Sequence, residues 1–493
     1  MNSPTNTTPA WKSYMATGNP SDIVASTTVA DAIGAKVDAT SGQSLNQQLE
    51  APTVTGGTAT GTDTSSSVVK VSGGSVSRTH AVKLNDVISV KDFGAKGDGS
   101  TDDTAAIQAA ITHMLSTSNS GGTVFFPDGH YSVSSPLIIG GSGITLLGHS
   151  PNAAHLITSS TTENIVEIGS GSSINEGVRI TGLGFSAAHP QTAGAAIYSH
   201  GAVSLMIDNI RVIENVYNGI VLDSDGSSTM GVFISNFDLK LILNSGITIG
   251  PTTGVTDIFI QNGIIRPGST FPYDGIHIIQ GYGVYIQNID ITNYGSFYFT
   301  HAIEIAPGSG QQSNAILLNQ VLCDSSNEEN MTLGGSGTIS DIQVVGSWFS
   351  TSVKSSGISF ENKNTDGVTI ASSTIDSNYT YGILLDKGKN IGISGNKIFA
   401  NSKGGKSSIS YDGIYVAAEV SHFSITNNQL GSGGYFNTIH AGGVTNYGVF
   451  VAAGASDDYI ISLNRGFGNT SGIVYDGGTG KNKYVAGNVE GTA

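Results

Sequence analysis

Short apolar runs recur along most of the chain, and within each run apolar and polar residues alternate with a period of two. Such alternation is typical of β-strands that bury one face. Aligning the runs gives one inward apolar position that repeats every 23 to 36 residues, most often every 26 or 27. The aligned positions are Leu146, Ile180, Ile207, Ile234, Ile260, Ile286, Leu318, Val344, Ile370, Ile393, Ile425 and Ile461.

A second repeated pattern, glycine followed by alternating apolar residues, runs out of phase with the first. It begins at Gly219, Gly246, Gly275, Gly357, Gly382, Gly413 and Gly448. Each repeat therefore holds two or three short strands separated by turns. No single repeat can bury its apolar face, so we expect the repeats to stack into an all-β, right-handed parallel β-helix. Asparagines two residues after the inward position, at Asn209, Asn236, Asn262 and Asn288, are expected to form a ladder at one turn, because asparagine tolerates the left-handed conformation.

The N-terminal end of such a coil must be covered. Thr101 or Asp102 can cap a helix over about residues 102–115, whose apolar face is Ile107, Ala110, Ile111 and Met114. The glycines before this helix do not form a phosphate-binding loop, since Lys96 precedes Gly97 and no Gly-Lys-Ser/Thr follows. The nearby aspartates also lack the distal glutamate of an EF-hand loop. The segment is therefore predicted to be a structural cap.

Composition supports a β-rich chain. Glycine numbers 67 and charged residues make up only 12% of the sequence, which indicates many tight turns. The net charge of −16 disfavours nucleic acids and anionic membranes as partners. The single cysteine, Cys323, excludes an intramolecular disulfide and is expected in the core. Residues 1–85 are rich in Ser, Thr and Gly towards their end and are interpreted as an attachment or linker segment, with the β-helix over residues 86–490.

The stretch "VISVKDFGAKGDGSTDDTAAIQAAI", followed by "GGTVFFPDGHYSVSSPLII", resembles the N-terminal signature of the pectate-lyase-type right-handed β-helix family, particularly as found in bacteriophage tailspikes. The resemblance is close over residues 85 to 150 and continues only as a pattern to about 490. It implies a homotrimeric protein of the virion tail, acting outside the cell, that binds and often cleaves a bacterial surface polysaccharide. Members also include lyases, hydrolases and epimerases, so the reaction must be argued from a site.

Outward residues at equivalent positions of a stacked coil form surface columns about 4.8 Å apart per coil. One such column is large and apolar, which monomers rarely expose, and we expect it to be a subunit interface. Cover by a loop or by the N-terminal segment is the alternative. The column consists of Met206, Phe233, Phe259, Tyr285 and Leu317.

A second column carries two carboxylates, Asp238 and Asp290, two coils and hence roughly 9 to 10 Å apart. This spacing is near the upper end for an inverting glycosidase. Arg266 is positioned to bind an acidic sugar and Trp348 to stack on a pyranose ring. The alternative is a solvated face whose charges are balanced by Lys240 and Arg266.

A third column, on the glycine-marked strands, brings His277 next to Glu304, with Asp274 just before His277. A histidine beside a carboxylate can act as a general acid or base. It can equally be a weak surface ion pair.

The sequence thus predicts a polysaccharide depolymerase that acts by glycosidic hydrolysis, with no cofactor and no metal. A polysaccharide lyase, a secreted bacterial enzyme or epimerase, and a glycan-binding adhesin or structural fibre without activity remain alternatives. Catalytic candidates are Asp238, Asp290, His277 and Glu304, and candidates for substrate binding are Arg266, Trp348 and Asp274.

Overall fold

The computed structural model describes residues 68–69, 75–117, 121–169, 175–224, 228–269, 273–405, 411–432, 443–454 and 457–491. The chain divides into two units, Met1–Leu84 and Asn85–Ala493. In the first unit, β1 (Val68–Val69) pairs antiparallel with β2 (Arg78–Thr79), and α5 (His80–Leu84) follows. Most of the predicted attachment segment lies outside the described residues. None of the helices in the described ranges has the length and hydropathy of a membrane span.

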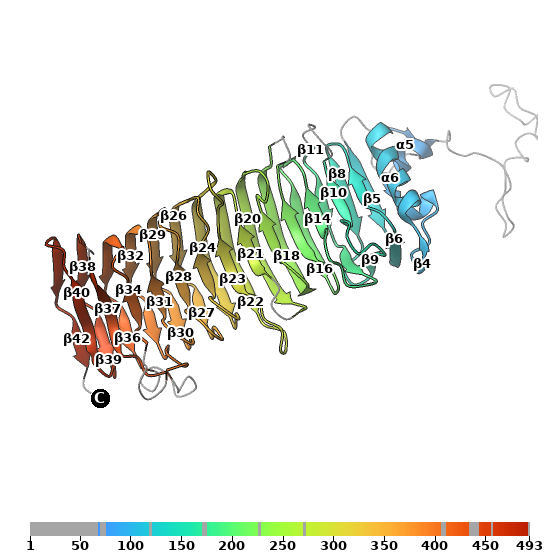
Figure 1. Ribbon diagram of the computed structural model, residues 1–493. Coiled ribbons are helices and arrows are strands. Elements are labelled where there is room, and N and C mark those ends of the chain that lie inside the picture. Colours follow the sequence, from blue (N-terminus) through green and yellow to red (C-terminus); the bar gives the residue numbers. More distant parts are fainter. Residues whose placement is uncertain are drawn as a thin grey trace, which may run out of the picture. The chain divides into compact units, whose positions relative to one another are not determined.

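The second unit is a parallel β-solenoid of about 13 turns (Figure 1). One of its sheets, here called sheet I, takes one strand from each successive coil. Its described strands are β7 (Leu137–Ile139), β10 (Val166–Ile168), β14 (Ala195–Ser199), β17 (Asn218–Leu222), β19 (Ile247–Ile249), β21 (Asp274–Ile278), β23 (His301–Ile305), β25 (Met331–Leu333), β28 (Ile358–Phe360), β31 (Ile383–Leu385), β34 (Ile414–Val416), β37 (Tyr447–Gly454) and β40 (Gly472–Gly478).

The remaining strands of this unit form sheet II, which wraps around the rest of each coil. They are β3 (Val87–Ser89), β4 (Asp98–Asp102), β5 (Gly122–Phe126), β6 (Gly129–Val133), β8 (Ile144–Gly148), β9 (Ala154–Thr158), β11 (Asn175–Glu176), β12 (Arg179–Thr181), β13 (Gly184–Ala187), β15 (Ala202–Val203), β16 (Met206–Val212), β18 (Met230–Ile242), β20 (Val255–Pro267), β22 (Gly281–Thr292), β24 (Gln312–Asp324), β26 (Thr338–Val345), β27 (Trp348–Ser350), β29 (Thr365–Ala371), β30 (Thr374–Asp376), β32 (Lys389–Ser394), β33 (Lys397–Phe399), β35 (Ser421–Thr426), β36 (Gln429–Gly431), β38 (Tyr459–Ser462), β39 (Arg465–Phe467), β41 (Lys483–Ala486) and β42 (Val489–Gly491).

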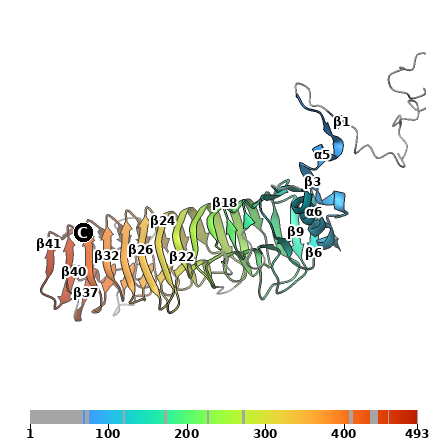
Figure 2. The same ribbon diagram turned by 90° about the horizontal axis from the view of Figure 1, so that it is seen from above.

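The predicted inward column is confirmed pair by pair. From Leu146 to Ile461, each aligned residue is the register partner of the next, and each is at most 1% exposed. Figure 2 shows the strands of successive coils lying side by side along the solenoid. The apolar stack forms one continuous interior, because each coil covers the face that its neighbour exposes.

Asparagine side chains form ladders at turns of the coils. Asn209, Asn236, Asn262 and Asn288 have φ angles of 49°, 53°, 56° and 53°, so the predicted left-handed positions are confirmed. A second ladder, which the sequence did not predict, lies inside the C-terminal coils at Asn396, Asn428 and Asn464, each 1% exposed. The Asn428 side chain accepts the backbone N–H of Asn396 at 3.0 Å and donates to the carbonyl of Ile393 at 2.9 Å.

The N-terminal end of the solenoid carries η1 (Val90–Phe93) and α6 (Thr104–Thr117), which packs on β5 and β7. The four predicted apolar residues of this helix are at most 1% exposed. The helix begins two residues later than the predicted position 102. Asp103 instead turns inward and accepts the backbone N–H groups of Lys96 and Gly97 at 2.6 and 2.9 Å, so it fixes the preceding loop.

Candidate active site

Neighbouring strands of sheet I carry two pairs of ionisable residues in register. On β21, Asp274 opens the strand and His277 follows three residues later, while β23 opens with His301 and carries Glu304. The strand pairing places Asp274 opposite His301 and His277 opposite Glu304. The two members of each pair therefore lie one coil apart along the solenoid. The four side chains form a square in which carboxylates and histidines alternate.

The square is held by short contacts around one buried carboxylate. Asp274 is 1% exposed, and its Oδ1 and Oδ2 atoms lie 2.9 Å from His301 Nδ1 and 3.1 Å from His277 Nδ1. His277 Nε2 lies 3.4 Å from Glu304 Oε2. The Glu304 and His277 side chains each keep 19% of their surface exposed. Asp274 is thus a positioning residue, whereas Glu304 and His277 can touch a ligand.

A fifth residue, Glu329, joins the square from the segment before β25. Its Oε2 atom lies 3.5 Å from His301 Nε2, and its other carboxylate oxygen accepts a hydrogen bond from Ser355. We call Asp274, His277, His301, Glu304 and Glu329 the carboxylate–histidine cluster. His301 has a carboxylate on each side of its ring.

Both histidines of the cluster favour the protonated form. Burial opposes protonation of His301, but hydrogen bonds to Asp274 and Glu329 outweigh it and raise its pKa to about 10. The pKa of His277 is also raised, because the contact with Asp274 outweighs burial. Burial acts to raise the pKa of Asp274, but its bonds to His277 and His301 lower it overall. At neutral pH this buried carboxylate is therefore ionised, and it lies between the two imidazole rings.

The two glutamates of the cluster differ in pKa. Burial, together with the negative charge of Asp274, raises the pKa of Glu304 to about 6. Burial also acts to raise the pKa of Glu329, yet hydrogen bonds from His301 and Ser355 lower it overall. Two carboxyl groups with pKa values shifted in opposite directions provide one proton donor and one ionised base at the same pH.

Ligand atoms of Asp274, His301 and Glu304 all lie within 4.8 Å of one another, which is close enough for a metal ion. Metal coordination requires a deprotonated imidazole nitrogen. In the structure both ring nitrogens of His301 face carboxylates, Asp274 at 2.9 Å and Glu329 at 3.5 Å. The same atoms are thus arranged as a hydrogen-bonded acid–base system.

Two cavities open beside the cluster on sheet I. One, of about 230 Å³, is lined by Tyr273, Asp274, Thr300, His301 and Glu304. The other, of about 300 Å³, extends over the preceding coils and includes Tyr198, Asn218, Asn244, Thr248, Tyr273 and His277. Tyr273 lines both cavities and is 62% exposed, so the two spaces adjoin at this ring.

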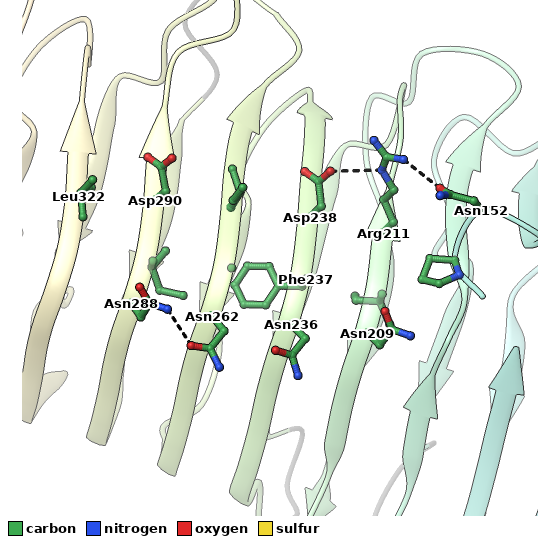
Figure 3. A pocket seen from close by; sticks show the side chains of 15 residues that line it. Asn152, Asn209, Arg211, Asn236, Phe237, Asp238, Asn262, Asn288, Asp290 and Leu322 are labelled. Carbon is green, nitrogen blue, oxygen red and sulfur yellow. Dashed lines mark hydrogen bonds and ion pairs between the residues drawn. The ribbon is translucent and has the colours of Figure 1, made fainter. Parts of the chain in front are cut away.

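The predicted pair of Asp238 and Asp290 lies elsewhere, in a groove of about 790 Å³ on sheet II (Figure 3). The register places Ile264 between the two aspartates, as the column predicted. Asp238 is held by two guanidinium groups, at 3.2 Å from Arg211 Nε and 2.8 Å from Arg266 Nη2. Arg211 also donates to Asn152 at 2.9 Å. Asp238 therefore lies at the centre of an ion network rather than alone.

The other predicted residues of this column are less constrained by ion pairs. Burial and the negative charge of Asp324 raise the pKa of Asp290, and Arg266 opposes this effect. Trp348 continues the column beyond Leu322, and its indole N–H donates to Asp376. The Trp348 ring is partly buried, so only part of it is accessible to a sugar.

The predicted apolar column on sheet II forms a stacked stripe, with Met206, Phe233 and Tyr285 exposed by 44%, 41% and 41%. Phe233 and Phe259 stack at 4.8 Å between ring centroids, and Phe259 and Tyr285 at 4.9 Å. Register continues the stripe to Leu317. Because the rings cover each other's faces, the stripe presents mainly ring edges to solvent.

Sequence reasoning found Asp274, His277 and Glu304 but missed His301 and Glu329. The signal for His301 was present in the sequence. "HAIE" follows "DGIH" by 27 residues, and both segments carry two ionisable residues three positions apart. Glu329 lies in "SSNEEN" between strands, where no periodic pattern says which acid faces inward.

Comparison with known proteins shows what the solenoid is similar to. Residues 87–315 match the family described as Rhamnogalacturonase A/epimerase, pectate lyase-like. This match includes Asp274, His277, His301 and Glu304 and ends before Glu329.

Two curated relatives act on polysaccharides, as their names state. A probable glucan endo-1,3-beta-glucosidase of Arthroderma benhamiae is 32% identical over 186 residues, which cover 32% of this chain and 20% of that protein. Mannuronan C5-epimerase AlgE1 of Azotobacter vinelandii is 28% identical over 210 residues, covering 41% of this chain and 14% of that protein. The chain thus spans a fifth or less of these relatives.

Among solved structures, tailspike protein 3 of bacteriophage CBA120 superimposes with a TM-score of 0.57 and 14% identity. The match covers 84% of this chain and 63% of that one. At this identity the similarity concerns the fold alone.

Proposed function

We propose that this protein, whose solenoid is of the pectate-lyase-like type, binds a bacterial surface polysaccharide or exopolysaccharide along sheet I and hydrolyses its glycosidic bonds. The opposite pKa shifts of Glu304 and Glu329 within one cluster are the observation that supports hydrolysis. Glycosidic hydrolysis requires such a pair, one protonated carboxyl and one carboxylate. The names of the curated relatives support polysaccharide as the class of substrate.

In the proposed reaction Glu304 donates its proton to the glycosidic oxygen as the bond from that oxygen to the anomeric carbon breaks. A water molecule attacks the same carbon and gives its proton to Glu329. His277, at 3.4 Å, holds the Glu304 carboxyl in place and stabilises its carboxylate after proton transfer. His301, between Asp274 and Glu329, fixes the orientation of the base.

The sheet II groove is a second candidate site. Its large volume and the raised pKa of Asp290 favour it, with Asp290 as the acid and Asp238 as the base. Arg211 at 3.2 Å and Arg266 at 2.8 Å pair with the Asp238 carboxylate and limit its movement towards substrate. We assign catalysis to sheet I because Glu304, the proposed proton donor, lines a cavity there. Arg266 and Trp348 are candidate sugar contacts in the groove.

We further propose that the stripe from Met206 to Leu317 joins the subunits of a homotrimer and that the protein is a phage tailspike. Exposed ring edges fit a protein partner better than a sugar, which stacks on ring faces. The fold of a tailspike supports this assignment. A glycan-binding adhesin without turnover is the alternative function.

The test is to incubate the protein with capsular, lipopolysaccharide and exopolysaccharide preparations while following reducing ends together with the ultraviolet absorbance of unsaturated uronates. Hydrolysis produces reducing ends alone, whereas a lyase produces both signals. Glu304→Gln should abolish turnover, while Asp290→Asn should leave it near the original rate. Loss of turnover in Asp290→Asn alone would move the active site to sheet II. Polymer binding without either signal would identify an adhesin.

A further inference from the structure

We infer that the sheet I site takes an uncharged polysaccharide and discriminates against polymers of uronic acids. This inference rests on the proposed function only in that sheet I is taken as the glycan-binding face. It concerns the charge of the substrate, which neither the fold nor the similar proteins determine, because one curated relative is named for a glucan and another for mannuronan.

The charge balance of the carboxylate–histidine cluster is the first argument. Two histidines face three carboxyl groups, and every imidazole nitrogen lies next to one of these carboxyls, so the cluster has no spare cation. A uronate carboxylate entering the cluster therefore meets no excess positive charge. Like charges brought together across a binding interface are unfavourable.

The histidine cations are also already occupied. Both ring nitrogens of His301 face protein carboxylates, Asp274 at 2.9 Å and Glu329 at 3.5 Å. Both ring nitrogens of His277 likewise face Asp274 and Glu304. A substrate carboxylate would have to displace one of these contacts and leave a buried protein carboxylate without its partner, which is costly.

The cavity lining gives the third argument. Among the described residues that line the two sheet I cavities, none is lysine or arginine. The lining instead presents neutral hydroxyls and amides, such as Thr248 and the hydrogen-bonded pair Asn244 and Asn218 at 2.8 Å. Neutral donors and acceptors together with the rings of Tyr198 and Tyr273 suit the hydroxyl groups and apolar faces of uncharged sugars.

The register neighbours of the cluster on the adjoining coils are also uncharged. In register, Thr248 precedes His277 on β19, and Thr332 follows Glu304 on β25. Thr332 is only 3% exposed, so a polymer that runs along the solenoid past the cluster meets a threonine, the partly exposed Thr248, on the side of β19. Recognition of a repeated carboxylate would need a cation at one of these positions.

The experiment compares binding of neutral glucans and galactans with binding of the same polymers after oxidation of C6 to the carboxylate, by affinity electrophoresis at low salt. We expect the neutral forms to bind at least about tenfold more tightly. Equal or tighter binding of the oxidised forms would overturn the inference, as would failure of every neutral polymer to bind.

A charge-insertion variant sharpens the test. Thr248→Lys should raise affinity for the oxidised polymers by about tenfold, because it supplies the missing cation. Thr369→Lys, on the exposed face of β29 in sheet II, adds the same charge away from the site and should change neither affinity. An equal response to both variants would contradict binding on sheet I. Turnover is measured separately: neutral polymers that bind without being cleaved would refute the hydrolase and leave this inference standing.

Discussion

The Nδ1 atom of His301 lies 2.9 Å from Oδ1 of Asp274, on the strand one coil earlier. Asp274 is almost fully buried, so this contact compensates a charge that water cannot reach. The same histidine reaches Glu329 through its other nitrogen. One imidazolium thereby links three successive coils of sheet I.

Replacement of His301 by alanine should destabilise the protein by about 3 kcal/mol, because it removes the imidazole that Asp274 and Glu329 share and leaves Asp274 with His277 and Glu329 with Ser355 as partners. The melting temperature at neutral pH measures this loss. His422→Ala is the matched control, since its pair with Asp458 at 3.3 Å is more than half exposed and should contribute little. A similar small change in both variants would contradict a buried charge at Asp274.

Stability should also depend on alkaline pH. The pKa of His301 in the folded protein, about 10, lies above its ordinary value of 6.5, so its stabilising effect is complete below pH 6.5 and is lost as the pH rises through 10. The melting temperature should fall over this window. In His301→Ala the part of the fall that comes from His301 should disappear, and an unchanged slope would refute the assignment.

The pH profile of kcat/KM should decline on its alkaline side with a midpoint near pH 6, because Glu304 must be protonated to act as the acid. Above that midpoint the rate should fall by roughly tenfold per pH unit. The groups that face Glu304 are Asp274, His277 and His301. The pKa of His301, about 10, lies well above this range, and the contact with Asp274 raises the pKa of His277. A profile that stays flat up to pH 8 would exclude Glu304 as the proton donor.

Chelation should leave activity unchanged. Of the potential metal ligands Asp274, His301 and Glu304, the first two are joined by a hydrogen bond between His301 Nδ1 and Asp274 Oδ1, and Glu304 instead contacts His277. Dialysis against EDTA followed by assay, with calcium and zinc added back to separate samples, measures the effect. A loss of activity that one of these ions restores would replace the acid–base reading of the cluster with a metal site.

The stripe on sheet II predicts an effect on assembly. The double variant Phe233→Ser and Tyr285→Ser should lower the molar mass measured by light scattering from that of a trimer towards that of a monomer, because it removes exposed apolar surface. Tyr484→Ser removes another exposed ring, on β41, and should not alter the mass. A monomeric unsubstituted protein would refute the interface.

Loss of an asparagine from the inner ladder should destabilise the protein much more than loss of an exposed asparagine. Asn428→Ala leaves the Ile393 carbonyl and the Asn396 N–H buried without partners, at about 1–3 kcal/mol for each group. Asn364→Ala removes a bond to the Ser336 carbonyl that is exposed, so water can replace it. The melting temperature should fall clearly in the first variant and little in the second.

The solenoid could be predicted from sequence because its core repeats. A single inward residue per coil, from Leu146 to Ile461, fixed the register and with it every outward column. The inner ladder was missed for a local reason. At "SGNKI" the left-handed residue is Gly395, so Asn396 points inward, whereas at Asn209 the asparagine itself is left-handed and stays exposed. Both turns have similar composition, and only the backbone conformation distinguishes them.

Only those residues of the cluster that lie on the repeating strands could be predicted from the sequence. His277 and Glu304 occupy equivalent strand positions, whereas Glu329 lies before β25 in a segment whose conformation depends on its hydrogen bonds to Ser355 and His301. The pKa difference between the two glutamates depends on burial and on these contacts, and neither is visible in a sequence. The helix boundary near Asp102 shifted for a similar reason, since Asp103 binds backbone groups of the preceding loop.

Because β21 pairs with β23, the cluster depends on which residues of the two strands face outward. It does not depend on the number of residues that separate the strands in the sequence. Insertions or deletions between the end of β22 at Thr292 and the start of β23 at His301 can change the connecting loop while hydrogen bonding restores the same partners. A shift of one residue within either strand has the opposite effect, since it turns Glu304 or His277 into the apolar interior. The loops of this coil are therefore free to diverge, whereas "DGIH" and "HAIE" can change only by substitution, which makes these eight positions the natural signature by which to search for proteins with the same chemistry.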